Sequence, residues 1–241
     1  MRILVFSAHP ADFCSRAGGT LAKHARAGAH VRVVSLTYGE RSESGGLYAQ
    51  GANPSLDEVR AVRHEEGTRA ADILGVEIAF LDWGDLALEP TVARTRALAE
   101  EMRSYRPDVI LTHHGPDSRS VDHDVTWQLV RRATQLAATV GLESSLPPTA
   151  TVPLFLFEAT LPLTEAEDFV PDFYVDITDV WEQKAEALRA FQRAQSFLLP
   201  LYTDQARLRA RQAAAISGQS AIAYAEAFER TLPWVGDALP L

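Results

Sequence analysis

Short runs of Val, Ile and Leu alternate along the chain with longer segments in which apolar residues recur at helical spacing. This alternation is typical of a parallel sheet covered by helices on both faces, so it predicts the α/β fold class. The expected strands are Ile3–Ser7, Val31–Leu36, Ile78–Leu81, Val109–Thr112, Pro153–Glu158 and Phe173–Asp176. The expected helices are Gly19–Ala27, Leu56–Leu74, Thr91–Tyr105, His123–Val140, Val180–Phe197 and Asp204–Phe228.

Local signals mark the ends of some of these elements. Ser55 and Glu58 have the spacing of a capping box ahead of Leu56, and Gly75 is a natural helix stop. The Gly-rich segment Gly39–Pro54 is long for a connection and follows a strand end. Because long loops at strand ends often carry function, we expect a lid over a site there.

Length and composition bound the organisation of the chain. With 241 residues, 46% of them hydrophobic and 23% charged, it can form one substantial core. We expect a single domain over residues 1–241, with C-terminal helices at about 178–230 packing on the rest. The segment Ser220–Leu241 could cap the core or contact another subunit, which leaves a homo-oligomer open.

Charge excludes some classes of partner. The formal net charge of −9 argues against binding nucleic acid or an anionic membrane surface, and an anionic substrate would need a local cationic pocket. No apolar run is long enough for a membrane span. The one cysteine, Cys14, cannot form an intrachain disulfide, so we expect a small packing residue in a soluble, cytoplasmic protein.

Histidine and aspartate gather where two of the predicted strands end. His9 and Asp12 follow the first strand on a loop, and the strand Val109–Thr112 runs into HHGPDSRSVDHD, which contains His123. The carboxyl ends of strands are where α/β sheets place ligands. Two histidines and one carboxylate form a catalytic zinc set that leaves a fourth position open, so these three residues are our candidate metal ligands.

Two alternatives accompany this interpretation. A histidine at a strand end is often only a surface or hydrogen-bonded residue. Two histidines and a carboxylate also hold iron in oxygenases. Those enzymes commonly carry H-x-D on a β-jelly-roll, whereas this chain has H-x-x-D on an α/β frame, which favours zinc, although another divalent transition metal could be bound.

The chain resembles the LmbE/PIG-L family, known for zinc-dependent deacetylases of N-acetylglucosaminyl compounds. The segments that carry the resemblance are AHPADFCSRAGG, VRVVSLTYGERSE, RHEEGTRAADILGVEIAFLDWGD, SVDHD and VDITDVWEQKAEALRAFQRAQ. The first resembles the family's AHPDDE…GG signature, and SVDHD stands in the place of its HPDH. The resemblance implies a Rossmann-like, LmbE-like fold.

Two departures from the deacetylase pattern bear on the reaction. The resemblance places Ala11 where the deacetylases have the aspartate that acts as general base, and alanine accepts no proton. It places Ser120 where they have a histidine that stabilises the oxyanion and protonates the leaving amine. A serine hydroxyl is a poor general acid near neutral pH, so amide hydrolysis loses both of its proton-transfer groups.

The pattern H-x-A-D-F before R-A-G-G, with a G-E-R-x-E-S loop, resembles the branch of the family formed by 4-oxalomesaconate hydratases. These add water to an unsaturated keto polycarboxylate in the catabolism of aromatic acids. Hydration needs an electrophile, which zinc can supply, and a base for water. Glu43 is the favoured base by its family counterpart, Glu40 is the reserve, and Asp122 is a proton relay or a partner of the metal site, or else an N-cap.

A small anionic substrate with several carboxylates calls for arginines, which grip carboxylates bidentately. The candidates are Arg41, Arg63 and Arg119, with His113 near the same strand end. Each could instead be an ordinary surface or structural residue. Arg16 is a weaker candidate.

Three functional hypotheses remain at this point. The leading one is a zinc-dependent hydro-lyase acting on an unsaturated keto polycarboxylate. The second is a zinc-dependent N-deacetylase in which Glu43 replaces the missing aspartate. The third is a metal-binding protein that has lost its activity.

Overall fold

The computed structural model describes residues 1–158, 160 and 168–233 of the chain. Seven strands form one sheet in the order β3-β2-β1-β4-β5-β7-β6. Strands β1 to β5 run parallel, whereas β7 is antiparallel to both of its neighbours. The bounds are Arg2–Ser7 for β1, His30–Ser35 for β2, Glu77–Phe80 for β3, Val109–His113 for β4, Leu154–Phe157 for β5, Phe173–Asp176 for β6 and Ala225–Arg230 for β7. The predicted α/β class with a mostly parallel sheet is confirmed.

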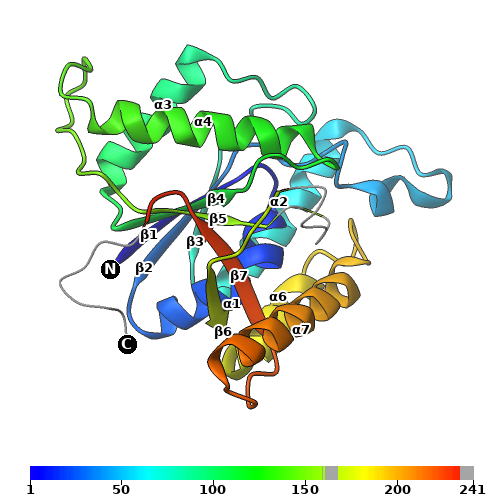
Figure 1. The fold of residues 1–241 in the computed structure, drawn as a ribbon. Helices are drawn as coiled ribbons and strands as arrows, with labels where there is room; N and C mark the ends of the chain where they lie inside the picture. Colours follow the sequence, from blue (N-terminus) through cyan, green and yellow to red (C-terminus); the bar gives the residue numbers. More distant parts are fainter. Residues whose placement is uncertain (159, 161–167, 234–241) are drawn as a thin grey trace.

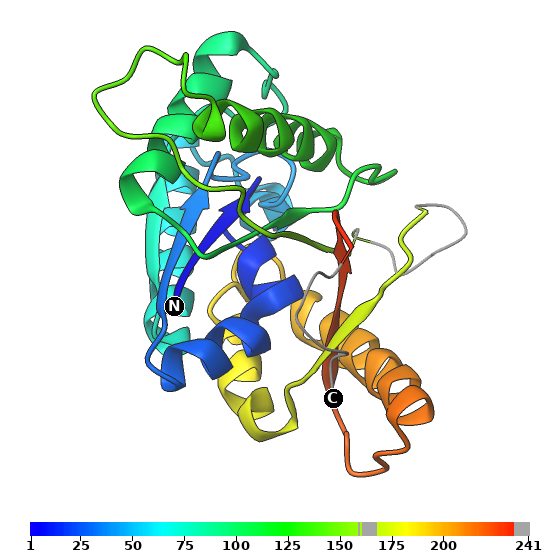
Figure 2. The same cartoon turned by 60° about the vertical axis from the view of Figure 1, so that its left-hand side comes forward.

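Helices cover both faces of the sheet (Figure 1). Helices α3 (Val92–Tyr105) and α4 (Val121–Ala138) lie together on one face. The other face carries α1 (Asp12–Arg26), α2 (Leu56–Leu74), α6 (Trp181–Arg189) and α7 (Leu198–Ser217). Figure 2 shows the same two layers from another side, with α7 against β6 and β7.

The central strand β1 explains why the sheet must be covered twice. Ile3 and Val5 belong to the core on the α1 side, whereas Leu4 and Phe6 belong to the core under α3 and α4. All four side chains are buried. A strand that is apolar on both faces is stable only between two layers of helices, which is the arrangement found.

Helix α2 begins and ends as its sequence predicts. The Ser55 side chain accepts a hydrogen bond from the backbone N–H of Glu58, and the Glu58 carboxylate accepts one from the backbone N–H of Ser55. Gly75 ends the helix in the left-handed conformation, with φ 73°. The helix therefore has the predicted bounds.

The first helix begins earlier than predicted. We expected it at Gly19–Ala27, but α1 starts at Asp12, so this residue is on the first turn of a helix and not on a loop. The glycine pair lies inside the helix because a neighbouring element approaches there. A Cβ on Gly19 would come within 2.7 Å of the Ile177 side chain.

The C-terminal elements also differ from the prediction. The helix expected at Val180–Phe197 ends at Arg189, and the helix expected at Asp204–Phe228 is α7, followed by β7. Gly218 ends α7 in the left-handed conformation, with φ 73°. The sequence AEAFER then enters the sheet between β5 and β6. Residues 234–241 of the predicted C-terminal segment, with Trp234, lie outside the described residues.

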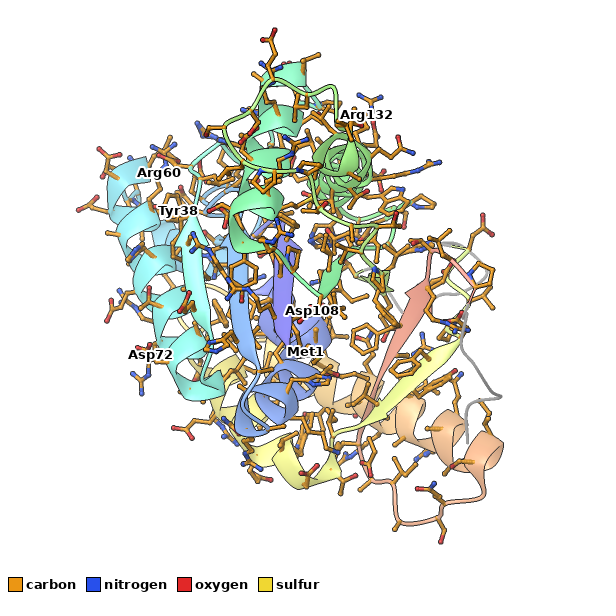
Figure 3. The ribbon with its side chains drawn as sticks, turned by 90° about the vertical axis from the view of Figure 1, so that its left-hand side faces the viewer. Met1, Tyr38, Arg60, Asp72, Asp108 and Arg132 are labelled. Atoms are coloured by element: carbon orange, nitrogen blue, oxygen red, sulfur yellow. The ribbon has the colours of Figure 1, made fainter. Side chains whose placement is uncertain are left out.

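The sheet topology marks one edge of the sheet as the expected place for a ligand site. Chain order reverses between β1 and β4, so their carboxyl ends open at a topological switch point, where α/β proteins bind ligands. Figure 3 shows Tyr38 and Arg60 toward this edge, whereas Met1 and Asp108 lie at the opposite one. Among the described residues, no helix is both long enough and apolar enough to cross a membrane.

Candidate metal centre

The three predicted metal ligands come together at the switch point. His9 follows β1, Asp12 opens α1, and His123 lies in the first turn of α4. His123 Nε2 is 3.4 Å from Asp12 Oδ1, and His9 Nδ1 is 3.5 Å from Asp12 Oδ2. All three side chains are about 1% exposed. Ligand atoms of these residues and of Glu43 lie within 4.8 Å of one another.

The donor atoms fit a divalent transition metal. Among the described residues, His9 Nδ1 and His123 Nε2 are buried nitrogen atoms with no hydrogen-bond partner, which is costly unless a ligand satisfies them. Both face the Asp12 carboxylate. Two imidazoles and one or two carboxylates are a donor set that suits zinc and its neighbours in the first transition series.

The orientation of the His123 ring is fixed by a carboxylate at its Nδ1 atom, the nitrogen that faces away from Asp12. Its Nδ1 lies 2.7 Å from Asp117 Oδ2, and that oxygen also accepts hydrogen bonds from the backbone N–H and the hydroxyl of Thr160. A carboxylate on the far nitrogen of a ligating histidine sets its tautomer and leaves the other nitrogen free for metal. Sequence reasoning did not assign Asp117, although it lies in the His- and Asp-rich stretch that follows β4.

His9 is held in a similar way. Its Nε2 lies 3.3 Å from Asp122 Oδ2 and 3.6 Å from Asp85 Oδ1. Asp122 also accepts a hydrogen bond from the backbone N–H of Leu86. Asp122, a predicted catalytic residue, therefore contacts the candidate metal ligand His9, and the N-cap of α4 is Ser120 and not Asp122. Sequence reasoning did not single out Asp85.

A buried arginine completes the surroundings of Asp12. Arg16 Nη1 is 2.7 Å from Asp12 Oδ1, its Nε donates to the Glu158 carbonyl, and its Nη2 donates to the Thr160 hydroxyl. Because the guanidinium is 3% exposed and occupied by these contacts, it holds Asp12, a candidate metal ligand, in place.

The charges in this centre shift the histidines in opposite directions. Burial alone disfavours a charged His9, but Glu43, Asp12, Asp122 and Asp85 together raise the pKa of His9 well above its ordinary value of 6.5. The pKa of His123 is also raised, because Asp12 and Asp117 outweigh the effect of burial. In contrast, burial and the neighbouring His123 lower the pKa of His113 to about 3.

The two candidate bases have different surroundings. Glu43 Oε1 is 3.4 Å from His9 Nδ1, and its side chain is 17% exposed, so it is within reach of both the metal ligands and solvent. Glu40 is 1% exposed, and its Oε1 pairs with Arg60 at 3.1 Å. Only Glu43 belongs to the described cluster of candidate ligand atoms, so the geometry favours Glu43 over Glu40.

The three candidate arginines differ in burial. Arg63 is fully buried, and its guanidinium bonds to Glu66, Glu43 and the Tyr38 carbonyl. It therefore holds Glu43 and presents no exposed surface to a substrate. Arg41 and Arg119 are exposed, and they flank the ligand segments on two different loops.

His113 is a supporting residue in this geometry. Its Nε2 accepts a hydrogen bond from the backbone N–H of Ala8 at 3.0 Å, and its ring stacks on His123 with 4.0 Å between centroids. It is 1% exposed. The two departures noted in the sequence also lie in the site: Ala11 is buried beside Asp12, and Ser120 precedes α4 without a side-chain cap.

Comparison with known proteins agrees with this fold and site. The family model described as PIG-L, GlcNAc-PI de-N-acetylase, matches residues 4–134 of the 241. The chain belongs to the PIG-L family, as the LmbE/PIG-L motifs predicted. Enzymes of this family are metal-dependent, and the His, Asp and Glu cluster could hold the metal.

Relatives within the family include both hydratases and deacetylases. The chain is 34% identical to the 4-oxalmesaconate hydratase of Pseudomonas putida, over 98% of this chain and 91% of that one. The crystal structure of GalB, the 4-carboxy-2-hydroxymuconate hydratase of the same species, superposes with a TM-score of 0.92 at 34% identity and covers 99% of both chains.

The deacetylase relatives are less similar. A 1D-myo-inositol 2-acetamido-2-deoxy-alpha-D-glucopyranoside deacetylase from Mycobacterium sp. strain KMS is 30% identical over 78% of this chain and 72% of the relative. The N,N'-diacetylchitobiose deacetylase of Pyrococcus horikoshii shares the fold, with a TM-score of 0.79, 22% identity and coverage of 95% of this chain and 83% of that one. The prediction of a family enzyme with greater similarity to the hydratases than to the deacetylases is confirmed.

Proposed function

We propose that this protein is a zinc-dependent hydratase that adds water to an unsaturated keto polycarboxylate in the catabolism of aromatic acids. The substrate class is that of 4-oxalomesaconate and 4-carboxy-2-hydroxymuconate, the compounds named for its relatives. The observation that carries the proposal is the buried set His9, Asp12 and His123 with Glu43 beside it, in a site where Ala11 replaces the deacetylase base.

Zinc, when bound by His9, Asp12 and His123, would supply a Lewis acid that polarises a substrate oxygen. Glu43 is the proposed base. Its carboxylate accepts a proton from the water whose oxygen adds to one carbon of the double bond, and the protonated carboxyl then returns that proton to the neighbouring carbon, so one whole water is added and Glu43 is regenerated. The contact from Arg63 Nη2 to Glu43 Oε2 at 3.4 Å holds the carboxylate in place. Asp117 and Asp122 orient the two histidines from behind.

The exposed arginines have a separate task. Arg41 lies two residues before Glu43, and Arg119 lies on the loop before α4. We assign both to the substrate carboxylates, because exposed guanidinium groups at the rim attract and orient an anion even though the protein carries a net charge of −9.

An absorbance assay tests the proposal. Zinc-loaded protein is added to 4-carboxy-2-hydroxymuconate, and loss of the conjugated absorbance is followed while the product is identified by mass. We expect a product heavier than the substrate by one water. An unchanged spectrum with fully loaded protein would rule the proposal out.

The deacetylase hypothesis remains as the second candidate because several relatives remove acetyl groups. In that reaction Glu43 would have to replace the missing aspartate base. The same protein preparation is therefore incubated with N-acetylglucosamine derivatives, and free amine is measured. Amine release without hydration would favour the deacetylase over the hydratase.

A further inference from the structure

A second cluster of titratable groups adjoins the candidate metal centre. His9 Nε2, Asp85 and Asp122 bring ligand atoms within 4.8 Å of one another, and all three residues are buried. Three of their four carboxylate oxygens accept hydrogen bonds from donors in the described residues. Asp122 Oδ2 accepts the backbone N–H of Leu86, and both oxygens of Asp85 accept donors from the loop that follows β2. These bonds make the cluster a hydrogen-bond network that links His9 to the loop after β2.

Asp85 makes the larger share of these bonds. Its Oδ2 accepts the backbone N–H groups of Arg41 and Ser42, each at 2.6 Å, and its Oδ1 accepts the Ser42 hydroxyl at 2.8 Å. The same Oδ1 lies 3.6 Å from His9 Nε2. The carboxylate is 0% exposed and contacts two distant parts of the site at once.

These bonds act on the residue that follows directly. Glu43 is next to Ser42, and its backbone N–H donates to the Gly39 carbonyl at 3.1 Å. The Ser44 hydroxyl donates to the same carbonyl at 2.8 Å. The turn from Gly39 to Ser44 is thus stabilised by hydrogen bonds among its own residues and by the hydrogen bonds that Asp85 accepts from Arg41 and Ser42.

We propose that Asp85 is a positioning residue that sets the distance between Glu43 and His9, by binding the backbone of Arg41 and Ser42. The inference rests on the proposed function, since it assumes that Glu43 is the base. Buried hydrogen bonds to a carboxylate are strong, and a base misplaced by about 1 Å costs about 100-fold in rate. Asp122 has a different task, because it contacts His9 and no part of the loop between Gly39 and Ser44 in the described contacts.

The test compares Asp85→Ala, Asp85→Asn and Asp122→Asn in the full-length, zinc-loaded protein. Alanine leaves two backbone N–H groups without an acceptor, whereas asparagine keeps one acceptor oxygen for them. We expect kcat to fall about 100-fold in Asp85→Ala and about tenfold in Asp85→Asn, with KM and the zinc dissociation constant changed less than about threefold. Asp122→Asn should instead weaken zinc binding about 10- to 100-fold.

Hydrogen exchange gives a readout that needs no activity. The amides of Arg41 and Ser42 should exchange faster in both Asp85 variants, and those of β1 should not. Asp82→Asn is the matched control, because Asp82 lies with Asp85 in the loop between β3 and α3. Its side chain is 48% exposed, and its backbone has φ 50°, which asparagine tolerates. It should leave kcat and the exchange of these amides unchanged.

The outcomes separate the two proposals. Wild-type protein without hydratase activity would refute the proposed function, while the exchange data would still test the role of Asp85. Unchanged exchange at Arg41 and Ser42 in the Asp85 variants, or a zinc affinity that falls as far as in Asp122→Asn, would overturn the inference. If the Asp85 variants do not fold, Ser42→Ala is the second variant. It removes the hydroxyl contacts of an exposed residue to Asp85 Oδ1 at 2.8 Å and to His9 Nε2 at 3.5 Å. It should lower kcat about three- to tenfold with the zinc dissociation constant changed less than about threefold, and an unchanged kcat would overturn the inference.

Discussion

At the scale of single residues, the proposed site depends on a carboxylate held between His9, a candidate metal ligand, and an arginine. Glu43 lies 3.4 Å from His9 through one oxygen and 3.4 Å from Arg63 through the other. Arg63 in turn pairs with Glu66 at 2.8 Å, so the guanidinium cannot move away easily. These two contacts hold the Glu43 carboxylate in one orientation beside His9.

Replacing this carboxylate tests its role. We expect Glu43→Gln to lower kcat about 10²- to 10⁴-fold, the range for loss of a general base, while zinc content stays near one equivalent. Steady-state kinetics and metal analysis measure both. Glu40→Gln is the comparison, because Glu40 faces Arg60, and its kcat should fall less than that of Glu43→Gln. A larger loss in Glu40→Gln would reverse the assignment of the base.

The raised pKa values of His9 and His123 predict how metal stabilises the protein at different pH. In the metal-free protein, protonation of these two histidines stabilises the folded state fully below about pH 6.5, the pKa of an unfolded histidine. That stabilisation disappears as the pH rises through the raised pKa values of the folded state. Zinc replaces those protons. The gain in Tm on adding zinc should therefore grow as pH rises from about 6.5 to 8.5.

A thermal scan of both forms across this range measures the effect. His113 has a lowered pKa and destabilises the folded state at acidic pH in both forms, so it largely cancels in the difference. A zinc-induced gain in Tm that shrinks with rising pH would contradict the assignment of these two histidines as ligands.

Residue identity alone predicted part of this site. His9, Asp12 and His123 follow from their places near strand ends, because the carboxyl ends of adjacent parallel strands meet at one edge. Asp85 and Asp117 were missed, since their role consists of hydrogen bonds to residues far away in the chain or to backbone groups. Such partners become visible only when the loops are folded against one another.

At the scale of elements, the segment predicted as a lid, Gly39–Pro54, contains the 3-10 helix η1 (Gly45–Gly51) and packs against the C-terminal half of the chain. The backbone N–H of Gly46 donates to the Ala194 carbonyl at 2.9 Å, and a Cβ at this position would be 2.3 Å from the Arg193 carbonyl oxygen. Backbone atoms make this contact on both sides, so rotating a side chain could not make room for an added Cβ.

Gly46→Ala should therefore displace the loop and lower kcat about tenfold or more, with little change in the overall fold. Gly45→Ala is the matched control, because nothing lies within 4 Å of a Cβ there. Kinetics and circular dichroism of both variants test this. Equal activity in the two variants would show that the contact between Gly46 and Ala194 does not affect the site.

The missed strand shows where periodicity stops being informative. The sequence from Leu198 to Phe228 contains alanines and arginines at spacings that suit a helix, yet Ala225–Arg230 is a strand. Its Glu226 is buried and accepts hydrogen bonds from the backbone of Gly19 and Thr20. Tertiary contacts of this kind override local propensity, whereas α2, with its capping box and glycine stop, was predicted correctly.

At the scale of the whole molecule, one buried ion pair joins α6 to β7, and its carboxylate also binds the backbone of the N-terminal helix α1. Glu226 on β7 bonds to Lys184 on α6 at 2.7 Å and to the backbone of α1, and both charged side chains are 2% exposed. Breaking the pair leaves a buried carboxylate without its cation. Lys184→Met should cost about 3–5 kcal/mol in the free energy of unfolding.

Denaturant unfolding measures that cost. Arg230→Met removes a partly exposed partner of Asp172 and is the control, with an expected cost of about 0–1 kcal/mol. If the two variants lost the same free energy, the buried pair would not be what joins β7 to α1 and α6.

The overall architecture was the most predictable level, because hydrophobic periodicity determines it. The strands of the parallel half were predicted to within a residue or two. Their order reverses between β1 and β4, and with right-handed crossovers this reversal places the connecting helices on opposite faces of the sheet. This order brings His9 from the end of β1 and His123 from beyond β4 to one place, so the whole fold is needed to form the metal centre.

The most direct test of the account is a zinc titration of metal-free protein in the presence of 4-carboxy-2-hydroxymuconate, for the wild type and His123→Ala side by side. The account predicts that hydration in the wild type rises to a plateau at one equivalent of zinc, and that the variant neither binds that equivalent nor turns over. Hydration without metal, or a His123→Ala variant with full zinc content and full activity, would contradict it.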